Sequence, residues 1–280
     1  MNTTPDDPIS SVTEFLNALG TAVPRAHDRL VLYRGHRNEL WELKPKIARN
    51  LFRHKLRFHN DPTARSAERR LFNLFRDLSF DLVPDHLLMG REAEVGWNQV
   101  VVAQHYGAPT RLLDWTANPL AALFFAVEGE ADPCPNDAVC SCGLSHDSAV
   151  YVLSRKLMDG RQDGFTVAAL ARKNPHPPHY TGGHDPGILI PPVVSRRILA
   201  QNSYFTISTD PTRPVPAERK ILISEAAPRA IREQLNHVGI TRVSLYPGDM
   251  DAIGAHLRDA YLRWDHEEGV CDADNWVPPT

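Results

Sequence analysis

Residues 104–126, QHYGAPTRLLDWTANPLAALFFA, place groups capable of chemistry directly before a strongly apolar stretch. Asn118 followed by Pro119 is typical of the N-cap and the first residue of a helix. Unpaired backbone N–H groups and the helix dipole favour an anionic ligand at this end, such as a phosphate. Packing alone does not require so many polar and aromatic side chains close together, namely His105, Tyr106, Arg111, Asp114, Trp115 and Thr116. The segment is therefore the first candidate for a functional site.

Arg34 is the second candidate, because it follows a compact apolar run at residues 30–33 that predicts a β-strand. A guanidinium at a strand end can hold a pyrophosphate or a ribose through several fixed donors, a geometry that lysine does not offer. An alternative is that Arg34 and Asp114 form a buried ion pair that joins the sheet to the helix.

The other candidates also have purely structural interpretations. Trp115 can belong to the core, Thr116 can serve only as a helix cap, and His105 suits the C-terminal end of a helix. Gln201 and Ser203 can simply end or begin a strand. The argument for function is that these polar residues gather at the ends of elements, whereas isolated polar residues would be scattered.

Periodicity and local signals give a coarse map of the elements. Hydrophobic periodicity and capping residues predict helices at residues 11–20, 63–83, 92–105, 228–238 and 250–264, and from Pro119 onward. Short apolar runs predict strands at residues 30–33, 149–153, 204–207, 220–224 and 242–246. Early helices combined with late strands favour an α+β fold over a regular doubly wound sheet.

Two segments, residues 130–148 and 174–192, are poor in apolar residues or rich in proline and glycine, which predicts irregular insertions outside the core. The first contains four potential zinc ligands, which are Cys134, Cys140, Cys142 and His146. Their spacing lacks the common C-x2-C pair. We therefore favour cysteines without a ligand role over a Cys₃His zinc site, and predict no metal.

The net charge of −3 hides an uneven distribution. Residues 44–76 contain ten Lys or Arg against two acids, whereas residues 249–274 contain eight acids against two arginines. The basic segment, which also contains phenylalanines, could follow a nucleic-acid backbone. Much of it also resembles the solvated faces of amphipathic helices, which are common.

Length and composition predict one domain over residues 1–280, with a core at about 11–257 and an acidic tail at 265–280. The sequence contains no apolar run of membrane-spanning length, and its first residues lack the features of a signal peptide. We therefore expect a soluble, cytoplasmic protein with reduced thiols and no membrane partner.

Three motifs resemble the hallmarks of the FRG domain family. The first is YRGH at residues 33–36, in which tyrosine keeps the aromatic character of the Phe-Arg-Gly in the family name. The second is the long middle motif at residues 104–126, and the third, RIxxQxSxFT, lies at residues 197–206. The resemblance extends over residues 11–257, and the middle motif is the most specific part.

The order of these motifs is also similar to that of ADP-ribosyltransferases of the arginine-serine-glutamate type. In those enzymes an arginine on an early strand is followed by a strand end leading into a helix, and then by a glutamate-bearing strand. Arg34 matches the arginine, residues 114–116 match the serine segment, and residues 149–153 match the next strand. Gln201 lies where the glutamate is expected and carries no charge, so a carboxylate such as Asp114 or Glu218 must compensate.

This second resemblance implies an ADP-ribosyltransferase-like central mixed sheet with N-terminal helices, and NAD as a substrate. As the neutral nicotinamide leaves, positive charge develops on the ribose and is stabilised by a nearby carboxylate or dipole. An aromatic face can stack on the nicotinamide. The expected catalytic residues are Arg34, Asp114, Thr116 and Gln201, and the expected NAD-binding residues are Arg34, Tyr106, Trp115, Thr116 and Ser203.

The resulting hypothesis is an enzyme that transfers ADP-ribose from NAD to a macromolecule, RNA or protein, or that hydrolyses NAD. Proteins with such domains resemble bacterial toxins or anti-phage effectors, which implies a neutralising antitoxin partner. The alternative is a non-catalytic module that binds nucleic acid or a protein partner through the basic residues 44–76.

Overall fold

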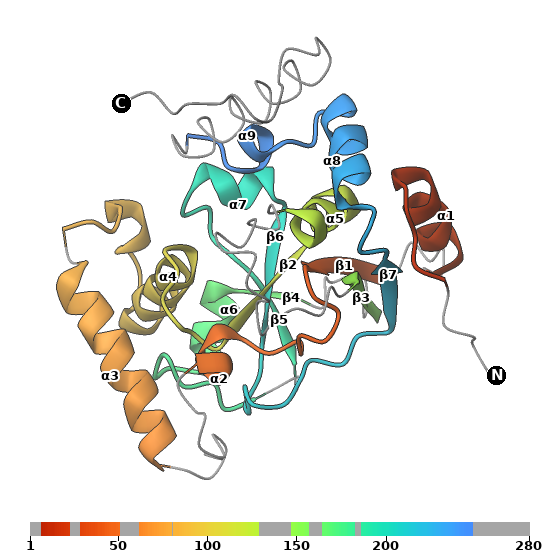
Figure 1. Cartoon of the computed structure of the whole chain (residues 1–280). Helices are drawn as coiled ribbons and strands as arrows, with labels where there is room; N and C mark the ends of the chain where they lie inside the picture. Colours follow the sequence, from red (N-terminus) through yellow and green to blue (C-terminus); the bar gives the residue numbers. More distant parts are fainter. Residues whose placement is uncertain are drawn as a thin grey trace, which may run out of the picture.

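The computed structural model describes residues 7–22, 29–50, 62–79, 81–128, 147–156, 164–182 and 186–248. These residues form an α+β fold around a seven-stranded sheet (Figure 1). The strands are β1 (Arg29–His36), β2 (Leu112–Thr116), β3 (Ser148–Lys156), β4 (Gly164–Thr166), β5 (Gly187–Ile190), β6 (Ser203–Ile207) and β7 (Arg219–Ile223). The helices are α1 (Val12–Ala22), α2 (Lys46–Asn50), α3 (Pro62–Leu78), η1 (Asp85–Leu87), α4 (Glu92–His105), α5 (Pro119–Val127), α6 (Val167–Lys173), α7 (Arg196–Ala200), α8 (Pro228–His237) and α9 (Arg242–Leu245).

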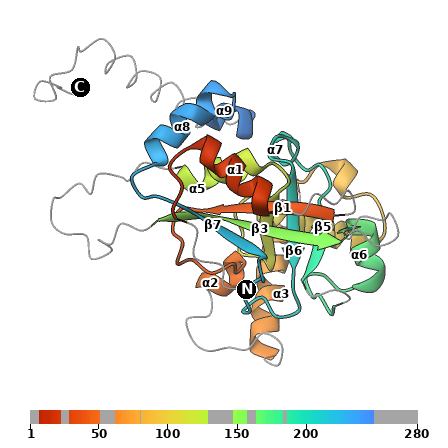
Figure 2. The ribbon, with the colours of Figure 1, turned by 90° about the vertical axis from the view of Figure 1, so that its right-hand side faces the viewer.

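The sheet consists of two halves that meet at one pair of residues. Its strand order is β4-β5-β6-β2-β1-β3-β7, with β4 and β5 parallel and all other neighbours antiparallel. β1 pairs with β3 along its whole length and β2 likewise with β6, but β1 and β2 pair only where Tyr33 lies opposite Thr116. Figures 1 and 2 show β1 and β3 running across the direction of β6, so the two halves diverge away from this pair.

Helix α5 contacts both halves of the sheet and packs most closely on β1. It begins at Pro119, and the side chain of Asn118 caps it by accepting hydrogen bonds from two backbone N–H groups of its first turn. The close approach to β1 depends on Gly35, because a Cβ at this position would lie 2.0 Å from the carbonyl oxygen of Ala122. Apolar residues of α5, α1, α8 and β1 then form one buried cluster.

Helices α4 and α6 cover the other half of the sheet. The fully buried Trp97 of α4 donates from its indole Nε1 to the carbonyl oxygen of Asn174 at 2.8 Å. Helix α3 is tied to this half by Glu68, whose carboxylate accepts two hydrogen bonds from the guanidinium of Arg111. Both side chains are at most 4% exposed. Arg111, which the sequence placed among the candidates for chemistry, is therefore part of the interior.

Most of the predicted elements are confirmed. Helix α4 has the predicted bounds, and the predicted helices at 11–20, 63–83, 119 onward and 228–238 correspond to α1, α3, α5 and α8. The predicted strands at 30–33, 149–153, 204–207 and 220–224 correspond to β1, β3, β6 and β7. The ends differ by a few residues, since α1 continues past Gly20 and α3 ends at Leu78. The prediction of an α+β fold with a mixed sheet is also confirmed.

Two predictions are wrong. Residues 242–246 form helix α9 instead of a strand, because the side chains of Thr241 and Ser244 make a capping box that provides partners for the backbone N–H groups at its start. Residues 174–192 are not wholly outside the core, because they contain β5, which lies between β4 and β6. The buried Ile188 and Leu189 of β5 belong to the core.

The remaining predictions fall on residues outside the described part of the chain. They are most of the 130–148 insertion with Cys134, Cys140, Cys142 and His146, the helix at 250–264, and the acidic residues 249–274 and 265–280. Residue 148 of the predicted insertion is described and begins β3.

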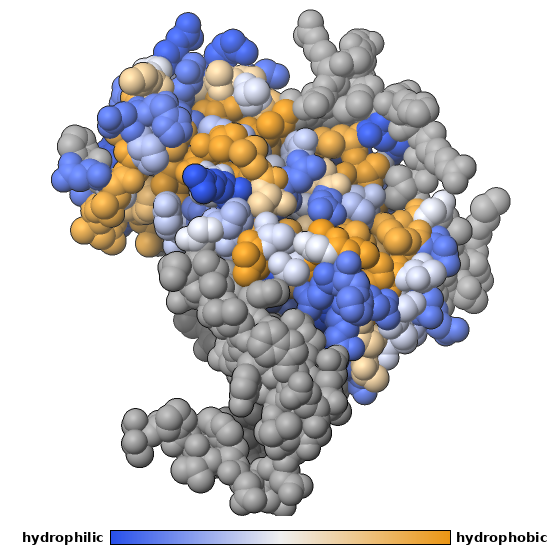
Figure 3. All heavy atoms as spheres, turned by 90° about the horizontal axis from the view of Figure 1, so that it is seen from above, coloured by the Kyte–Doolittle hydropathy of each residue, from blue (hydrophilic) through white to orange (hydrophobic). Residues whose placement is uncertain are grey.

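Several large apolar side chains are exposed on α3 and on the segment that follows it, namely Leu74, Leu78, Leu82 and Met89. Figure 3 shows apolar surface at the left of the view. Among the described residues, no helix has both the length and the apolar character needed to cross a membrane.

Candidate functional site

The three sequence motifs meet at the C-terminal end of β2. Thr116, the last residue of β2, lies opposite Tyr33 of the first motif on one side and opposite Ser203 of the third motif on the other. A cleft of about 930 Å³ opens at this meeting point. Of the site residues expected from the sequence, those that line this cleft are Arg34, Asp114, Trp115, Thr116, Gln201 and Ser203.

Two of the first candidates lie elsewhere. Tyr106 is 73% exposed and does not line the cleft, although its ring contacts that of His105 edge to face. Arg111 points into the interior toward Glu68. His105 itself does line the cleft, at the C-terminal end of α4.

Arg34 is held in one orientation by two hydrogen bonds. Its Nε donates to Nε2 of His36 at 2.9 Å, and its Nη1 donates to the carbonyl oxygen of Asp114 at 2.6 Å. Because Arg34 Nε is a donor, His36 Nε2 must carry no proton, and His36 Nδ1 therefore donates to the carbonyl oxygen of Trp41 at 3.2 Å. The Arg34 side chain is 16% exposed and lines the cleft.

Burial explains the protonation states of this pair. Burial, together with the cations Arg34 and Arg49, lowers the pKa of His36 to about 3, so the ring is neutral at physiological pH. Burial also lowers the pKa of Arg34 to about 10, an effect that Asp114 opposes and Arg49 reinforces. Arg34 therefore stays cationic, and the neutral His36 acts as its hydrogen-bond acceptor.

Asp114 brings a negative charge into the cleft. Its Oδ2 accepts a hydrogen bond from Nε2 of Gln104 at 2.9 Å and lies 3.7 Å from Nη1 of Arg34. Gln104 is oriented in turn by Thr110, which donates to its Oε1 at 2.6 Å. The Asp114 side chain is 55% exposed, so the carboxylate is held in place and remains accessible to a ligand. Arg34 and Asp114 do pair, but the pair lies at the cleft surface and is not buried.

Thr116 and Gln201 connect the second and third motifs. The hydroxyl of Thr116 donates to the carbonyl oxygen of Gln201 and accepts from the backbone N of Asn118 at 2.9 Å, and the residue is only 3% exposed. The side-chain Nε2 of Gln201 donates to the carbonyl oxygen of Leu245 at 3.0 Å. A glutamate in this orientation would place a carboxylate oxygen against the carbonyl oxygen of Leu245, with no hydrogen to donate. The observed hydrogen bond therefore requires the amide of Gln201.

Trp115 and Ser203 also line the cleft. Trp115 is 3% exposed, and its Nε1 donates to the hydroxyl of Thr206 at 3.0 Å, which fixes the indole in the core. Little of its ring is therefore available for stacking on a ligand. Ser203 is half-buried at the start of β6.

Cations outnumber acids around the cleft. In the described part of the chain the lining cations are Arg34, Lys44, Lys46, Arg49 and Arg197, and the lining acids are Glu42 and Asp114. Glu42 accepts from Lys44 at 2.6 Å, and Lys46 donates to the carbonyl oxygen of Gly107. Arg49 donates only to the carbonyl oxygen of Lys44, at 2.7 Å, so its charge is unpaired within the described residues. This arrangement favours an anionic ligand.

Several lining or supporting residues were missed as site residues by the sequence interpretation. His36 had a signal, because strand alternation places it on the same face as Arg34. Arg197 lies in the third motif and Gln104 in the second, so both could have been inferred. No sequence pattern pointed to Arg49 or Tyr246 as site residues. Only the fold brings α2 and the C-terminal end of α9 to the cleft.

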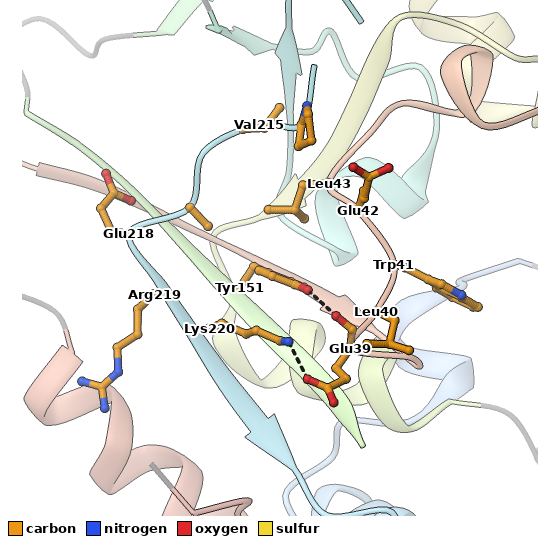
Figure 4. Close-up of a pocket in the computed structure, with 12 residues that line it drawn as sticks. Glu39, Leu40, Trp41, Glu42, Leu43, Tyr151, Val215, Glu218, Arg219 and Lys220 are labelled. Carbon is orange, nitrogen blue, oxygen red and sulfur yellow. Dashed lines mark hydrogen bonds and ion pairs between the residues drawn. The ribbon is translucent and has the colours of Figure 1, made fainter. Parts of the chain in front are cut away.

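A second, smaller pocket of about 410 Å³ lies beside the first. Leu40, Trp41 and Glu42 line both cavities, so the segment after β1 forms the wall between them. Figure 4 shows two contacts that shape the smaller pocket: Tyr151 donates from its hydroxyl to the carbonyl oxygen of Glu39, and Lys220 donates to the Glu39 carboxylate.

Glu218 lies in this smaller pocket and not in the cleft. One carboxylate oxygen of Glu218 accepts from the backbone N of Ser154, and the other lies 3.4 Å from the guanidinium of Arg155. Of the two carboxylates that the sequence offered as replacements for a glutamate, only Asp114 faces the cleft. Among the described residues, no group of three or more His, Cys, Asp or Glu side chains could hold a metal ion.

Comparison with known proteins supports the family resemblance. Residues 29–134 match the FRG domain, and this stretch contains the first two of the three motifs. No curated protein and no solved structure shows a significant match. The geometry of the cleft therefore provides the main evidence on function.

Proposed function

We propose that the cleft of this FRG-type chain binds NAD and transfers its ADP-ribose to a macromolecule, RNA or protein, or to water. The observation that carries the proposal is the convergence of the three motifs, which brings Arg34, Asp114 and Gln201 around one cleft. The order of β1, β2 with α5, β3 and β6 agrees with the order expected for an arginine-serine-glutamate type transferase. An ADP-ribosyltransferase-like fold is part of this proposal.

The size and charge of the cleft suit a dinucleotide. Its volume of about 930 Å³ lies near the upper end of the range of roughly 300–1,000 Å³ for small-molecule sites. Arg34 and Arg49 supply fixed guanidinium donors for a diphosphate. Exposed aromatic surface is available from Trp41, which is 44% exposed, and not from Trp115.

In the proposed reaction the bond between the nicotinamide nitrogen and the anomeric carbon of the ribose breaks. The electron pair of the bond leaves with nicotinamide, which becomes neutral, and positive charge develops on the ribose. The carboxylate of Asp114 stabilises this charge. A hydroxyl group of the acceptor or a water molecule attacks the anomeric carbon and loses its proton, and Asp114 is the cleft carboxylate able to accept it.

Gln201 has a supporting role in this scheme. Its amide is engaged by the carbonyl oxygen of Leu245, and its backbone carbonyl by the hydroxyl of Thr116. It thereby fixes the end of β2 relative to α7 and α9. The absence of a glutamate at this position is compatible with chemistry carried by Asp114 on β2.

The test is incubation of the purified chain with NAD labelled in the adenosine part, together with cellular RNA and protein. We expect labelled macromolecule or free ADP-ribose, with release of nicotinamide. Asp114→Asn should lower kcat by about 100-fold or more with a smaller change in KM, because the carboxylate acts on the transition state. Arg29→Lys is the matched control, since Arg29 lies on β1 outside the cleft and should leave both constants unchanged. Absence of labelled product and of nicotinamide would reject the proposal.

A second candidate function is nucleic-acid binding without catalysis. Lys44, Lys46 and Arg49 line the cleft, and α3 exposes Arg65, Arg69, Arg70 and Arg76. The other cations of the basic segment lie outside the described residues. Binding of this kind would weaken steeply with salt and would not change NAD. If the acceptor of ADP-ribose is RNA, the chain would both bind nucleic acid and modify it. An enzyme of this kind would act as a toxin that a partner protein inhibits.

A further inference from the structure

Arg197 is a cleft residue whose charge is not neutralised. It lines the cleft from α7, and its guanidinium carbon lies 4.4 Å from the centre of the Tyr246 ring. Within the described part of the chain it makes no side-chain hydrogen bond and no ion pair, and its Nε is buried without a partner. An unsatisfied buried donor on a cation is costly unless a ligand or an ion completes it.

The ring beneath Arg197 is fixed in place. The hydroxyl of Tyr246 donates to Oε2 of Glu128 at 3.1 Å, and Oε1 of the same carboxylate lies 3.5 Å from the guanidinium of Arg242. Glu128 is therefore engaged by Tyr246 and Arg242. Burial and Glu128 raise the pKa of Tyr246, so the ring stays a neutral phenol. Stacking on such a ring orients a guanidinium without neutralising it.

His105 lines the same cleft from the C-terminal end of α4. Burial and the nearby Arg197 lower the pKa of His105, and Asp114 partly opposes this effect. The ring is therefore neutral at physiological pH and can donate one hydrogen bond without adding a positive charge. Arg197 and His105 together offer a planar cation and a neutral donor.

Arg197 and the other unpaired arginine of the cleft, Arg49, come from different helices. Arg49 lies on α2 and Arg197 on α7, and Figures 1 and 2 both show α7 above the strands and α2 below them. The charge of Arg49 contributes to the lowered pKa of Arg34, whereas the charge of Arg197 contributes to the lowered pKa of His105. The cleft is therefore lined by cations from two separate elements, and Asp114 raises the pKa of both Arg34 and His105.

We infer that Arg197, stacked on Tyr246, and His105 form a second anion subsite that takes a phosphate monoester. The subsite extends the proposed function, because it rests on the cleft being the substrate site, and it requires a substrate phosphate beyond the diphosphate of NAD. Such a phosphate is carried either on the ribose of a phosphorylated dinucleotide or on a nucleotide acceptor.

The test is a titration of the full-length chain with inorganic phosphate at constant ionic strength, followed by backbone amide NMR. We expect saturable shifts at Leu199 and Gln201 beside Arg197. Arg197→Gln should weaken this binding about ten-fold or more, because a charge-assisted hydrogen bond is lost. Arg196→Gln is the matched control, since Arg196 is the exposed neighbour on α7 that does not line the cleft. Arg49→Gln should leave these shifts intact.

Two further titrations identify the source of the phosphate. If it belongs to the dinucleotide, NAD phosphorylated on the 2′-hydroxyl binds more tightly than NAD, and Arg197→Gln removes the difference. If it belongs to a nucleotide acceptor, adenosine 5′-monophosphate binds in the presence of saturating NAD, and Arg197→Gln weakens only the monophosphate.

The inference is overturned if phosphate moves no amide of α7, or if Arg197→Gln retains the shifts. A lower Tm of Arg197→Gln with unchanged phosphate affinity would also overturn it, because Arg197 would then serve only to pack α7 against α9. The phosphate titration contains no NAD. Phosphate can therefore bind at Arg197 even if the chain does not bind NAD, and NAD can bind even if phosphate does not, so the two proposals fail separately.

Discussion

At the scale of residues, the central feature is the pair formed by Arg34 and His36. A lone arginine on a strand has many orientations, but His36 accepts from its Nε and the carbonyl of Asp114 accepts from its Nη1. Two of the five guanidinium donors are thereby used to orient the group, and the others remain for a ligand. The histidine must be neutral to play this part.

The neutral state of His36 predicts a pH dependence of stability. Its pKa is about 3 in the folded chain against the ordinary 6.5, so the unfolded state binds more protons between these values. Its contribution to stability is present above about pH 6.5 and is lost as the pH falls toward 3. At about pH 5 the free energy of unfolding should be lower by roughly 2 kcal/mol than at neutral pH because of His36.

Chemical denaturation of the wild type and His36→Gln between these pH values measures this effect. Glutamine does not titrate, so the free energy of unfolding of the variant should fall less steeply on acidification. His179, whose pKa is lowered to about 4 mainly by burial, titrates in both proteins and cancels in the comparison. Parallel pH profiles for the two proteins would contradict the assignment.

At the scale of elements, the fold depends on the close contact between β1 and α5. Gly35→Ala should destabilise the chain by about 1–3 kcal/mol, because the added methyl group meets backbone atoms of α5 that cannot move independently. Gly20→Ala is the control, since Gly20 lies within α1 and its Cβ would meet nothing within 4 Å. This control should be neutral or stabilising by up to about 1 kcal/mol. Equal Tm values for the two variants would refute the role of Gly35.

The attachment of α3 gives a second prediction at this scale. Arg111→Met leaves Glu68 charged and buried, and should cost about 3–5 kcal/mol in the free energy of unfolding. Arg76→Met removes an exposed ion pair with Asp77 and should change stability by less than about 1 kcal/mol. Urea denaturation of both variants measures the difference. A change of less than about 1 kcal/mol for Arg111→Met would contradict the role of this buried ion pair in attaching α3.

At the scale of the whole molecule, much of the architecture could be predicted because local signals were strong. Capping at Asn118 and the apolar run after it identified α5, and periodicity identified α4 with its bounds. Residues 187–190 were missed as a strand because the prolines and glycines around them masked a run of only four residues. Residues 242–246 were misassigned because β-branched and aromatic residues suggested a strand where the Thr241 capping box decides for a helix.

The candidate site was predictable only in part. Motif order indicated that Arg34, Asp114, Thr116 and Gln201 belong together, and they do line one cleft. The role of Gln201 as a donor to Leu245 depends on α9, which the sequence did not suggest. Arg49 reaches the cleft from α2, a short helix with no periodic signal, and Tyr106 points away from it.

The most direct test of the account is the binding of NAD to the cleft, measured by isothermal titration calorimetry. We predict saturable binding to one site per chain. Arg34→Lys should weaken it at least about ten-fold, because a single amine cannot donate to His36 and Asp114 and also hold a diphosphate. Arg29→Lys should bind NAD as the wild type does. Absence of binding, or equal affinity of the wild type and Arg34→Lys, would contradict the assignment of this cleft to NAD.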